Sequence, residues 1–170
     1  MVVIVISGPP GSGKSTIAKL LSSKTGLRVL SAGSIFRELA EKMGIGVVEL
    51  NKLALSDPTI DLKIDKIIVE RARRDDVIVE SHLAAWLLDN ADLRVYLTAP
   101  LMERIRRIAK RDSIDLDKAK VEVIKREELQ WKRFKKLYGV DVTDLSVFDL
   151  FFNTYKVPMD SIVEVILKSI

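Results

Sequence analysis

Short apolar runs alternate along the chain with longer stretches in which apolar residues recur every three or four positions. The short runs are continuous and rich in β-branched residues, which predicts strands buried on both faces of a sheet. They lie at residues 2–7, 28–32, 77–81, 93–99 and 148–154. The longer stretches predict helices at residues 14–24, 34–43, 47–55, 60–73, 83–90, 100–112, 116–137 and 159–168.

This alternation predicts an α/β domain in which a five-stranded parallel sheet has helices on both faces. The 170 residues suffice for one core, and neither a repeat nor a linker divides them, so we expect a single domain over residues 1–170. Ligands of such sheets bind beyond the carboxyl ends of the strands. The segments that follow the strands are therefore where candidate chemistry is expected.

The composition excludes several classes of protein. No apolar run approaches the ~20 residues of a membrane span, and the first residues lack the basic region and cleavage site of an export signal. We therefore expect a cytoplasmic protein without a membrane partner. Because the chain has no cysteine, disulfides and thiolate metal sites are excluded. Charged residues reach 31% while Asn and Gln are scarce, a balance that leans towards heat-adapted proteins.

The net charge of +4 is compatible with nucleic acid or with a small anionic substrate. Aromatic residues make up only 6% of the chain and form no stacking array beside the basic segments, which disfavours nucleic acid. We therefore expect small-molecule substrates, and we expect the chain to be a monomer.

The segment after the first strand matches the phosphate-binding pattern G-x-x-x-x-G-K-[ST] in full, between a predicted strand and a predicted helix. Its glycines lack Cβ, so backbone N–H groups can approach an anion, and the following helix adds its positive end. We expect Lys14 to reach the outer phosphates of ATP, Ser15 to bind Mg²⁺ and Thr16 to contact the α-phosphate. The candidate ATP-binding residues are Gly8, Pro9, Pro10, Gly11, Ser12, Gly13, Lys14, Ser15 and Thr16.

Glu80 closes the apolar run VIVE at the carboxyl end of the third predicted strand. A carboxylate after a buried strand needs a partner. It could contact a metal-bound water or a substrate, or it could form a salt bridge with a nearby basic residue. We favour the first interpretation, in which Ser15 and Glu80 order Mg²⁺ directly or through water.

The second predicted strand leads into the turn of Ser31, Gly33 and Ser34, in which Ser34 could cap the next helix. Arg37 is expected on the first turn of that helix, where a cation opposes the helix dipole. A bidentate contact with a second anionic substrate would explain it. The alternative is a surface ion pair with Glu41.

Two consecutive predicted helices carry basic residues on one face. Arg104, Arg107 and Arg111 follow the spacing i, i+3, i+7, and Arg126 and Arg133 follow the spacing i, i+7. Such a face suits a lid that closes over transferring phosphates and excludes water, because phosphoryl transfer depends on positioning and positive charge.

The alternative is a solvated face with ion pairs such as Glu103–Arg107 and Glu122–Arg126. Part of the set is expected to be of that kind, and Arg106 and Lys110 are the residues that we expect at the surface.

Five segments together resemble the archaeal-type cytidylate kinases, which belong to the nucleoside monophosphate (NMP) kinase family of P-loop proteins. They are ISGPPGSGKST (6–16), SAGSIFRELAEKMG (31–44), IDLKIDKIIVE (60–70), VIVES (77–81) and REELQWKRFKKLYGVDVTDLSVFDLFFNT (126–154). The resemblance implies that ATP and Mg²⁺ convert CMP or dCMP to CDP or dCDP. It also implies the three-layer P-loop NTPase fold, with a helical NMP-binding insert at about 33–73 and a short lid at about 104–115.

The same resemblance implies roles for single residues. Arg37 would hold the CMP phosphate, and the candidate phosphate clamps are Arg107, Arg111, Arg126 and Arg133. With Lys14, the candidates for catalysis are Arg107, Arg111 and Arg126. Ser31 and Gly33 join the predicted acceptor site.

One segment departs from the family pattern, in which the third strand ends E-G-R-L-A-G-W. Here Ser81 and His82 stand in place of the first glycine and the arginine. If that arginine contacts the nucleotide, His82 supplies a weaker and pH-dependent donor. The alternative is an ordinary residue at the start of a helix.

Asp61 and Asp65 are four residues apart on one face of a predicted helix within the insert. A carboxylate is a natural acceptor for the exocyclic amino group of cytosine, so either residue could read the base. Alternatively, the two form a solvated stripe on the helix.

The sequence leaves two alternatives to CMP phosphorylation open. The acceptor could be another monophosphate, AMP or UMP. The chain could also be an ATP-driven assembly factor of the same fold that acts on RNA or on a protein.

Overall fold

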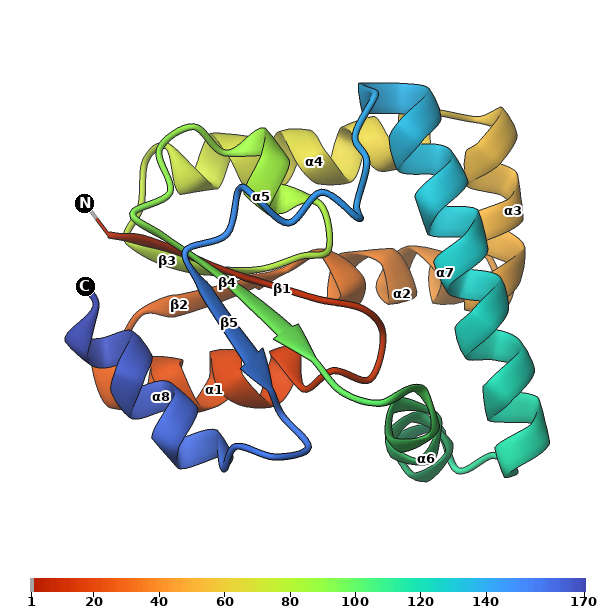
Figure 1. Ribbon diagram of the computed structural model, residues 1–170. Helices are drawn as coiled ribbons and strands as arrows, with labels where there is room; N and C mark the ends of the chain where they lie inside the picture. The colour runs from red at the N-terminus through yellow and green to blue at the C-terminus, as the bar shows by residue number, and fades with distance from the viewer. Residues whose placement is uncertain (1) are drawn as a thin grey trace.

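A computed structural model describes residues 2–170 and contains one parallel sheet with the strand order β2-β3-β1-β4-β5 (Figure 1). The strands are β1 (Val3–Ser7), β2 (Arg28–Ser31), β3 (Val77–Glu80), β4 (Leu93–Thr98) and β5 (Leu150–Asn153). The helices are α1 (Lys14–Thr25), α2 (Ala32–Lys42), α3 (Val47–Ser56), α4 (Thr59–Ala72), α5 (Ala84–Leu87), α6 (Leu101–Asp112), α7 (Leu116–Tyr138) and α8 (Met159–Lys168). The predicted α/β fold is confirmed.

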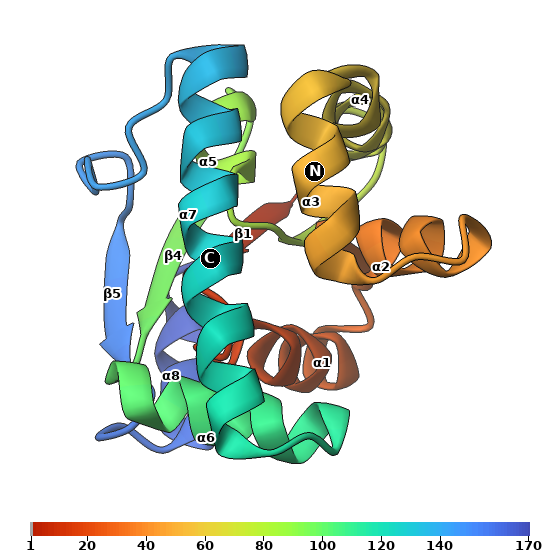
Figure 2. The same cartoon turned by 90° about the vertical axis from the view of Figure 1, so that its right-hand side faces the viewer.

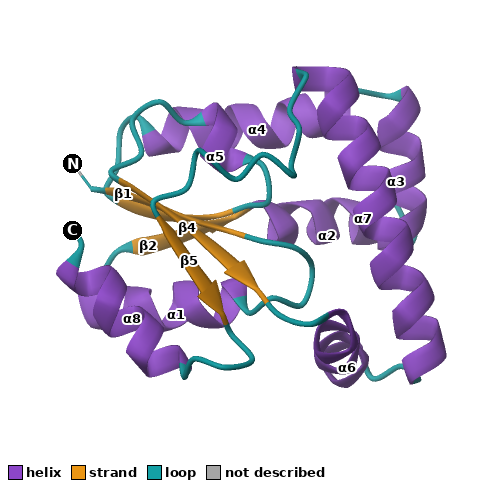
Figure 3. Cartoon of the chain, in the orientation of Figure 1, coloured by secondary structure: helices purple, strands orange, loops and turns teal. Residues whose placement is uncertain are grey.

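Two apolar layers hold the helices against the sheet, and Figure 3 shows helices above and below the strands. Ile4 and Ile6 of β1 point to the layer with α1 and α8, where they meet Ile17 and Ile162. Alternate residues of the same strand point to the opposite layer, which α4 and α5 cover. The strand β1 is therefore buried on both faces, and the segment that follows it leaves the centre of the sheet.

The prediction that every strand is buried on both faces is wrong for the edges of the sheet. Arg28 and Val29 of β2 are exposed, and so are Phe151 and Asn153 of β5. A strand at the edge has a neighbour on one side only, so its apolar residues need not all lie under helices.

The helical segments outside the sheet form two further clusters. Apolar residues of α2, α3 and α4 pack together, namely Ala40, Leu50, Ala54 and Ile60. The helices α6 and α7 share a second cluster of Ile105, Ile108, Ala109, Ala119 and Val123. Figure 2 shows the long helix α7 beside α3, so α7 connects the part near α6 with the part formed by α2–α4. No helix within residues 2–170 has both the length and the apolar character to cross a membrane.

Two local predictions are wrong. Ser31, not Ser34, caps α2, because the Ser31 side chain accepts a hydrogen bond from the Ser34 backbone N–H at 3.2 Å. The helix starts at Ala32, which places Arg37 on its second turn, so the argument from the helix dipole does not apply to Arg37.

The helix predicted at 83–90 is also shorter than expected, since α5 ends at Leu87. Arg94 of β4 stabilises the chain after it, because the guanidinium donates to the carbonyl oxygens of Ala85, Leu88 and Ala91 at 3.1, 2.5 and 3.3 Å. Arg94 thereby supplies hydrogen-bond donors for carbonyl oxygens at and after the end of the short helix, which has no donors of its own for them.

We predict that Arg94→Met lowers the stability of the fold without affecting the cavity described below. The variant loses three charge-assisted hydrogen bonds, each of which contributes up to about 3 kcal/mol to the free energy of unfolding. Thermal unfolding should show a lower Tm than for Arg74→Met, which removes an exposed arginine from the turn before β3. An Arg94→Met protein as stable as the Arg74→Met control would contradict the role of these bonds.

Candidate active site

A cavity of about 420 Å³ opens at the carboxyl ends of the central strands, between α1, α2, α4, α6 and α7. Its wall contains cations, two carboxylates of α4, and apolar and aromatic side chains. The predicted site residues that line it are Pro10, Gly11, Gly13, Lys14, Ser15, Thr16, Gly33, Arg37, Asp61, Asp65, Glu80, His82, Arg107, Arg111, Arg126 and Arg133. The cavity therefore brings together residues from six separate segments of the chain, at 10–16, 33–37, 61–65, 80–82, 107–111 and 126–133.

The phosphate loop, residues 8–15, has a backbone that only glycine allows at two of its positions. Gly8 has φ 144° and Gly11 has φ 78°. A Cβ on Gly8 would lie 2.1 Å from the Leu97 carbonyl oxygen, and a Cβ on Gly11 would lie 2.6 Å from the Arg104 carbonyl oxygen. The loop is thus pressed against β4 and α6, and its close approach requires glycine at both positions.

Lys14 begins α1 and its ammonium group lies over the loop. Nζ donates to the carbonyl oxygens of Gly8 and Pro9 at 2.8 and 3.0 Å. Burial lowers the pKa of Lys14 to about 8, although the nearby charge of Glu80 acts in the opposite direction. The ammonium is therefore poorly solvated, and an anion in the cavity would stabilise its charged form.

Ser15 and Glu80 face each other at the end of β3. The Ser15 hydroxyl donates to Oε1 of Glu80 at 2.7 Å, and Glu80 is only 7% exposed. Hydroxyl and carboxylate oxygens are suitable partners for Mg²⁺. Within residues 2–170 no group of three or more metal-ligating carboxylate or imidazole side chains gathers. The pair fits a magnesium ion that takes its remaining ligands from phosphate and water.

Three arginines with few partners meet across the cavity. The pKa of Arg126 is lowered to about 10, first by burial and then by the charges of Arg111 and Arg37. Within the described residues 2–170, the buried Nε of Arg126 has no hydrogen-bond partner. Arg111 donates to Asp112 at 2.7 and 2.8 Å, and Arg37 donates to the Ser34 hydroxyl at 3.1 Å. Arg111 therefore has a carboxylate partner in Asp112, whereas Arg126 lies between two other cations and has a buried Nε that is open to an anion.

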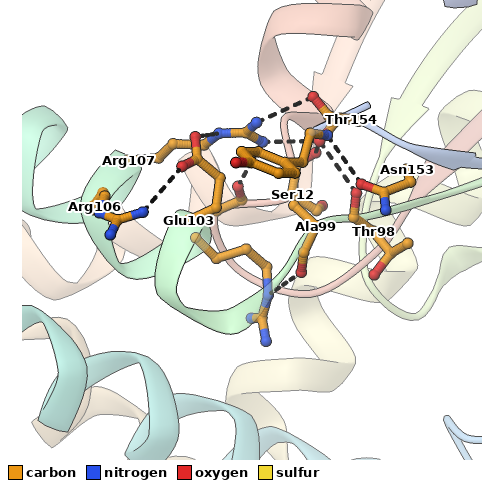
Figure 4. Close-up of polar contacts among 11 residues, drawn as sticks. Ser12, Thr98, Ala99, Glu103, Arg106, Arg107, Asn153 and Thr154 are labelled. Atoms are coloured by element: carbon orange, nitrogen blue, oxygen red, sulfur yellow. Dashed lines mark hydrogen bonds and ion pairs between the residues drawn. The ribbon is translucent and has the colours of Figure 1, made fainter. Parts of the chain in front are cut away.

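Two further arginines of α6, Arg104 and Arg107, bind groups of the protein itself. Arg107 donates to Glu103, to the Gly11 carbonyl oxygen and to both oxygens of Thr154, at distances from 2.8 to 3.3 Å (Figure 4). Arg104 is buried, pairs with Glu127 and donates to the carbonyl oxygens of Pro10 and Ala99. The face predicted from the spacing i, i+3, i+7 therefore divides: Arg107 and Arg111 line the cavity, whereas Arg104 lies behind it. Arg106 and Lys110 lie at the surface, as expected.

At the far wall, Arg133 of α7 binds Asp61 of α4. Arg133 Nε and Nη2 donate to the two carboxylate oxygens at 2.6 and 3.0 Å, and Nη1 donates to Asn51. Because Asp61 and Arg133 are 5% and 3% exposed, the interpretation of Asp61 as part of a solvated stripe is wrong. The guanidinium also lies near the rings of Phe36 and Phe134. Each nitrogen of Arg133 already has a protein partner, which sets it apart from Arg126.

His82 and Asp65 also line the cavity. His82 Nδ1 lies 3.3 Å from Oε1 of Gln130, and burial lowers the His82 pKa to about 4. His82 is therefore neutral near pH 7 and cannot supply the charge of an arginine. Asp65 accepts a hydrogen bond from the Tyr138 hydroxyl, and burial raises the pKa of Asp65 to about 6.

Some predicted residues lie behind the wall, and others were missed. Ser31 caps α2, the carbonyl groups of Gly8 and Pro9 bind Lys14, and Ser12 is buried under the loop. Further lining residues that the sequence did not predict include Phe36, Gln130, Phe134 and Met159. Gln130 could have been found, because it lies four residues after Arg126 and thus on the same face of a helix.

Solved structures with similar folds include an uncharacterized protein from Eubacterium ventriosum, with a TM-score of 0.74, 17% identity, and coverage of 99% of this chain and 97% of that chain. Shikimate kinase from Acinetobacter baumannii, solved in complex with shikimate, gives a TM-score of 0.63 and 18% identity over 99% and 92% of the two chains. At these identities the likeness concerns the fold.

Sequence relatives are much more similar. A cytidylate kinase of Ignicoccus hospitalis is 55% identical over 169 residues, which cover 99% of this chain and 98% of the relative. A cytidylate kinase of Staphylothermus marinus is 50% identical, with 100% and 97% covered. Residues 3–156 match the Cytidylate kinase-like family. The chain therefore belongs to the cytidylate kinase-like family.

Proposed function

We propose that the protein transfers the γ-phosphoryl group of ATP to CMP or dCMP, in line and without a phospho-enzyme. The observation that carries the proposal is the group of Arg37, Arg111 and Arg126, which face one another across a cavity beside the phosphate loop. Like charges in such an arrangement repel, and two nucleotide phosphates between them would remove that repulsion. The names of the relatives support CMP as the acceptor.

In this proposal the donor phosphates lie on the phosphate loop and at the start of α1. Backbone N–H groups and Lys14 would hold them, since the ammonium group is buried next to the loop. Mg²⁺, held by Ser15 and through water by Glu80, would neutralise charge on the β- and γ-phosphates. Arg107 fixes the loop itself, because it donates to the Gly11 carbonyl oxygen.

The acceptor phosphate would lie near Arg37 and Arg126, across the cavity from the donor. No general base is required, because the oxygen that attacks already carries negative charge. The protein contributes orientation and positive charge on the transferring group, which are the main sources of rate in phosphoryl transfer. Arg111 comes from α6, within the predicted lid, and Arg126 comes from α7, after it. The bounds of the lid at about 104–115 and of the insert at about 33–73 stay predictions.

The purified protein, assayed with ATP and Mg²⁺, should phosphorylate CMP and dCMP with higher kcat/KM than UMP or AMP. A coupled assay for ADP together with chromatography of the nucleotide products measures this directly. If UMP or AMP is the best acceptor, the proposed substrate is wrong. If ATP is hydrolysed without any phosphorylated acceptor, the kinase reaction itself is wrong.

Lys14→Met should leave the fold intact and lower kcat by about 10²–10³-fold or more, since one buried charged donor beside the transferring group is lost. Circular dichroism would check the fold and single-turnover kinetics the chemical step. Lys19→Met, at an exposed position of α1, is the matched control. Near-normal turnover of Lys14→Met would contradict the assignment.

The binding of ATP should also weaken as the pH rises above about 8, where free Lys14 loses its proton. Bound phosphates raise the pKa of Lys14, so binding takes up a proton in this range, and the affinity falls by up to about tenfold for each pH unit. Titration calorimetry from pH 7 to pH 9.5 measures the trend. Lys14→Met should lack it, and an equal dependence in both proteins would show that another group is responsible.

Arg126→Met should lower kcat/KM for CMP by about 10²–10³-fold while it maintains or raises the Tm of the free protein. The variant removes a cation whose buried Nε has no hydrogen-bond partner in the part of the chain that the structure describes, and it removes the repulsion of that cation with Arg111 and Arg37. Arg106→Met, at an exposed position, should change neither quantity. A marked loss of stability in Arg126→Met would indicate a structural role instead.

A further inference from the structure

The two carboxylates of α4 that line the cavity have different partners. Both oxygens of Asp61 accept hydrogen bonds from Arg133, and Asp61 is almost fully buried. Asp65 lies one turn later and is partly exposed to the cavity. Tyr138 donates to its Oδ2, whereas no group within residues 2–170 donates a hydrogen bond to its Oδ1. Asp65 therefore retains an open acceptor, and Asp61 is bound to α7.

The wall around Asp65 has the character of a pocket for a flat ring. Apolar and aromatic side chains line the same cavity, namely Phe36, Val47, Ile64, Leu83 and Phe134. Such walls bury the faces of an aromatic ligand, while a small number of polar groups determine its orientation and identity. The cations that would hold a phosphate are in the same cavity, so a nucleotide could present its base to α4.

Given the proposed function, we propose that Asp65, and not Asp61, accepts a hydrogen bond from the exocyclic amino group of cytosine and thereby sets the preference for CMP over UMP. An ionised carboxylate only accepts hydrogen bonds. The amino group of cytosine donates, whereas uracil carries an oxygen acceptor at the same position. A fixed carboxylate therefore attracts cytosine and repels uracil, so both the attraction and the repulsion contribute to selectivity.

Tyr138 is a positioning residue in this arrangement. Its hydroxyl occupies Oδ2 of Asp65 and so limits rotation of the carboxyl group. It also lowers the pKa of Asp65, as does the charge of Arg133, whereas burial and the charge of Asp61 raise it, with a net pKa of about 6. His82, on the wall after β3, is neutral in this range and adds no charge.

Protonation would change the chemistry of the contact. A protonated Asp65 carries an O–H donor, which can meet the oxygen of uracil. The selectivity for CMP should therefore be full above pH 7 and should decline as the pH falls through about 6. Tyr138→Phe removes a group that lowers the pKa of Asp65, so it should move the midpoint of this decline to higher pH.

The test compares kcat/KM for CMP and UMP in the wild-type protein, Asp65→Asn and Asp61→Asn. An Asn side chain can present either its oxygen or its amino group to the base. Asp65→Asn should lower the CMP/UMP ratio about 5- to 150-fold, which corresponds to about 1–3 kcal/mol of discrimination. Asp61→Asn should lower the Tm, because Arg133 then lacks its charged partner, and it should leave the ratio unchanged.

The outcomes separate this inference from the proposed function. A wild-type protein that does not phosphorylate CMP contradicts the proposed function. A protein that prefers CMP, with the same ratio in Asp65→Asn, overturns the inference alone, and so does a ratio that falls only in Asp61→Asn. Retained turnover of UMP by Asp65→Asn shows that the variant is folded.

The pH profile gives a second readout. The CMP/UMP ratio should decline below pH 7 in the wild-type protein, begin to decline at higher pH in Tyr138→Phe, and stay constant in Asp65→Asn between pH 5 and pH 8. A constant ratio in the wild-type protein, or the same midpoint in Tyr138→Phe, would overturn the role assigned to Asp65 and Tyr138.

Discussion

The repulsion between the cations that line it is the constraint on which the cavity depends. The Nε of Arg126 is buried and has no hydrogen-bond partner within residues 2–170, and Arg126 lies close enough to Arg37 and Arg111 for both to lower its pKa. Two guanidinium groups do not approach each other in this way without an energetic cost. Apolar packing offsets this repulsion, since α2, α6 and α7 each belong to an apolar cluster that holds the helix in place. The protein is thus preorganised for a strongly anionic ligand.

The arginines of α6 have two distinct roles, because Arg111 lines the cavity while Arg104 and Arg107 hold the phosphate loop. Arg104 and Arg107 donate to carbonyl oxygens of the phosphate loop, at Pro10 and Gly11. These bonds direct the loop carbonyl groups towards cations on one side, and the amide groups are left for an anion on the other. The glycines allow the close packing between loop and helix, because a Cβ at Gly11 would meet the backbone of Arg104. The shape of the loop therefore depends on α6 as well as on its own sequence.

Much of this arrangement could be predicted from the sequence, and the failures have physical causes. The order of strands and helices followed from periodicity, because β1 and β3 are buried on both faces and show it in their composition. The end of the helix predicted at 83–90 could not be derived from local sequence, because the end of α5 depends on Arg94, a residue of the next strand. The identification of the phosphate loop required only local sequence. The distinction between paired and unpaired arginines depended on contacts with Glu127, Thr154 and Asp61, which lie 23 to 72 residues away in the sequence.

A single helix, α7, organises the acceptor side of the cavity. Its successive turns present Arg126 to the cations, Gln130 to His82, Arg133 to Asp61, and Tyr138 to Asp65. The charge balance changes along this helix. Arg126 forms no salt bridge among the described residues 2–170, whereas Arg133 pairs with Asp61, so positive charge is open near the phosphate loop and neutralised near α4. Such a gradient would orient a nucleotide with its phosphate towards Arg126 and its uncharged base towards α4. The phosphate then meets the wall that requires a counter-charge, and the base meets the wall whose arginine is already paired.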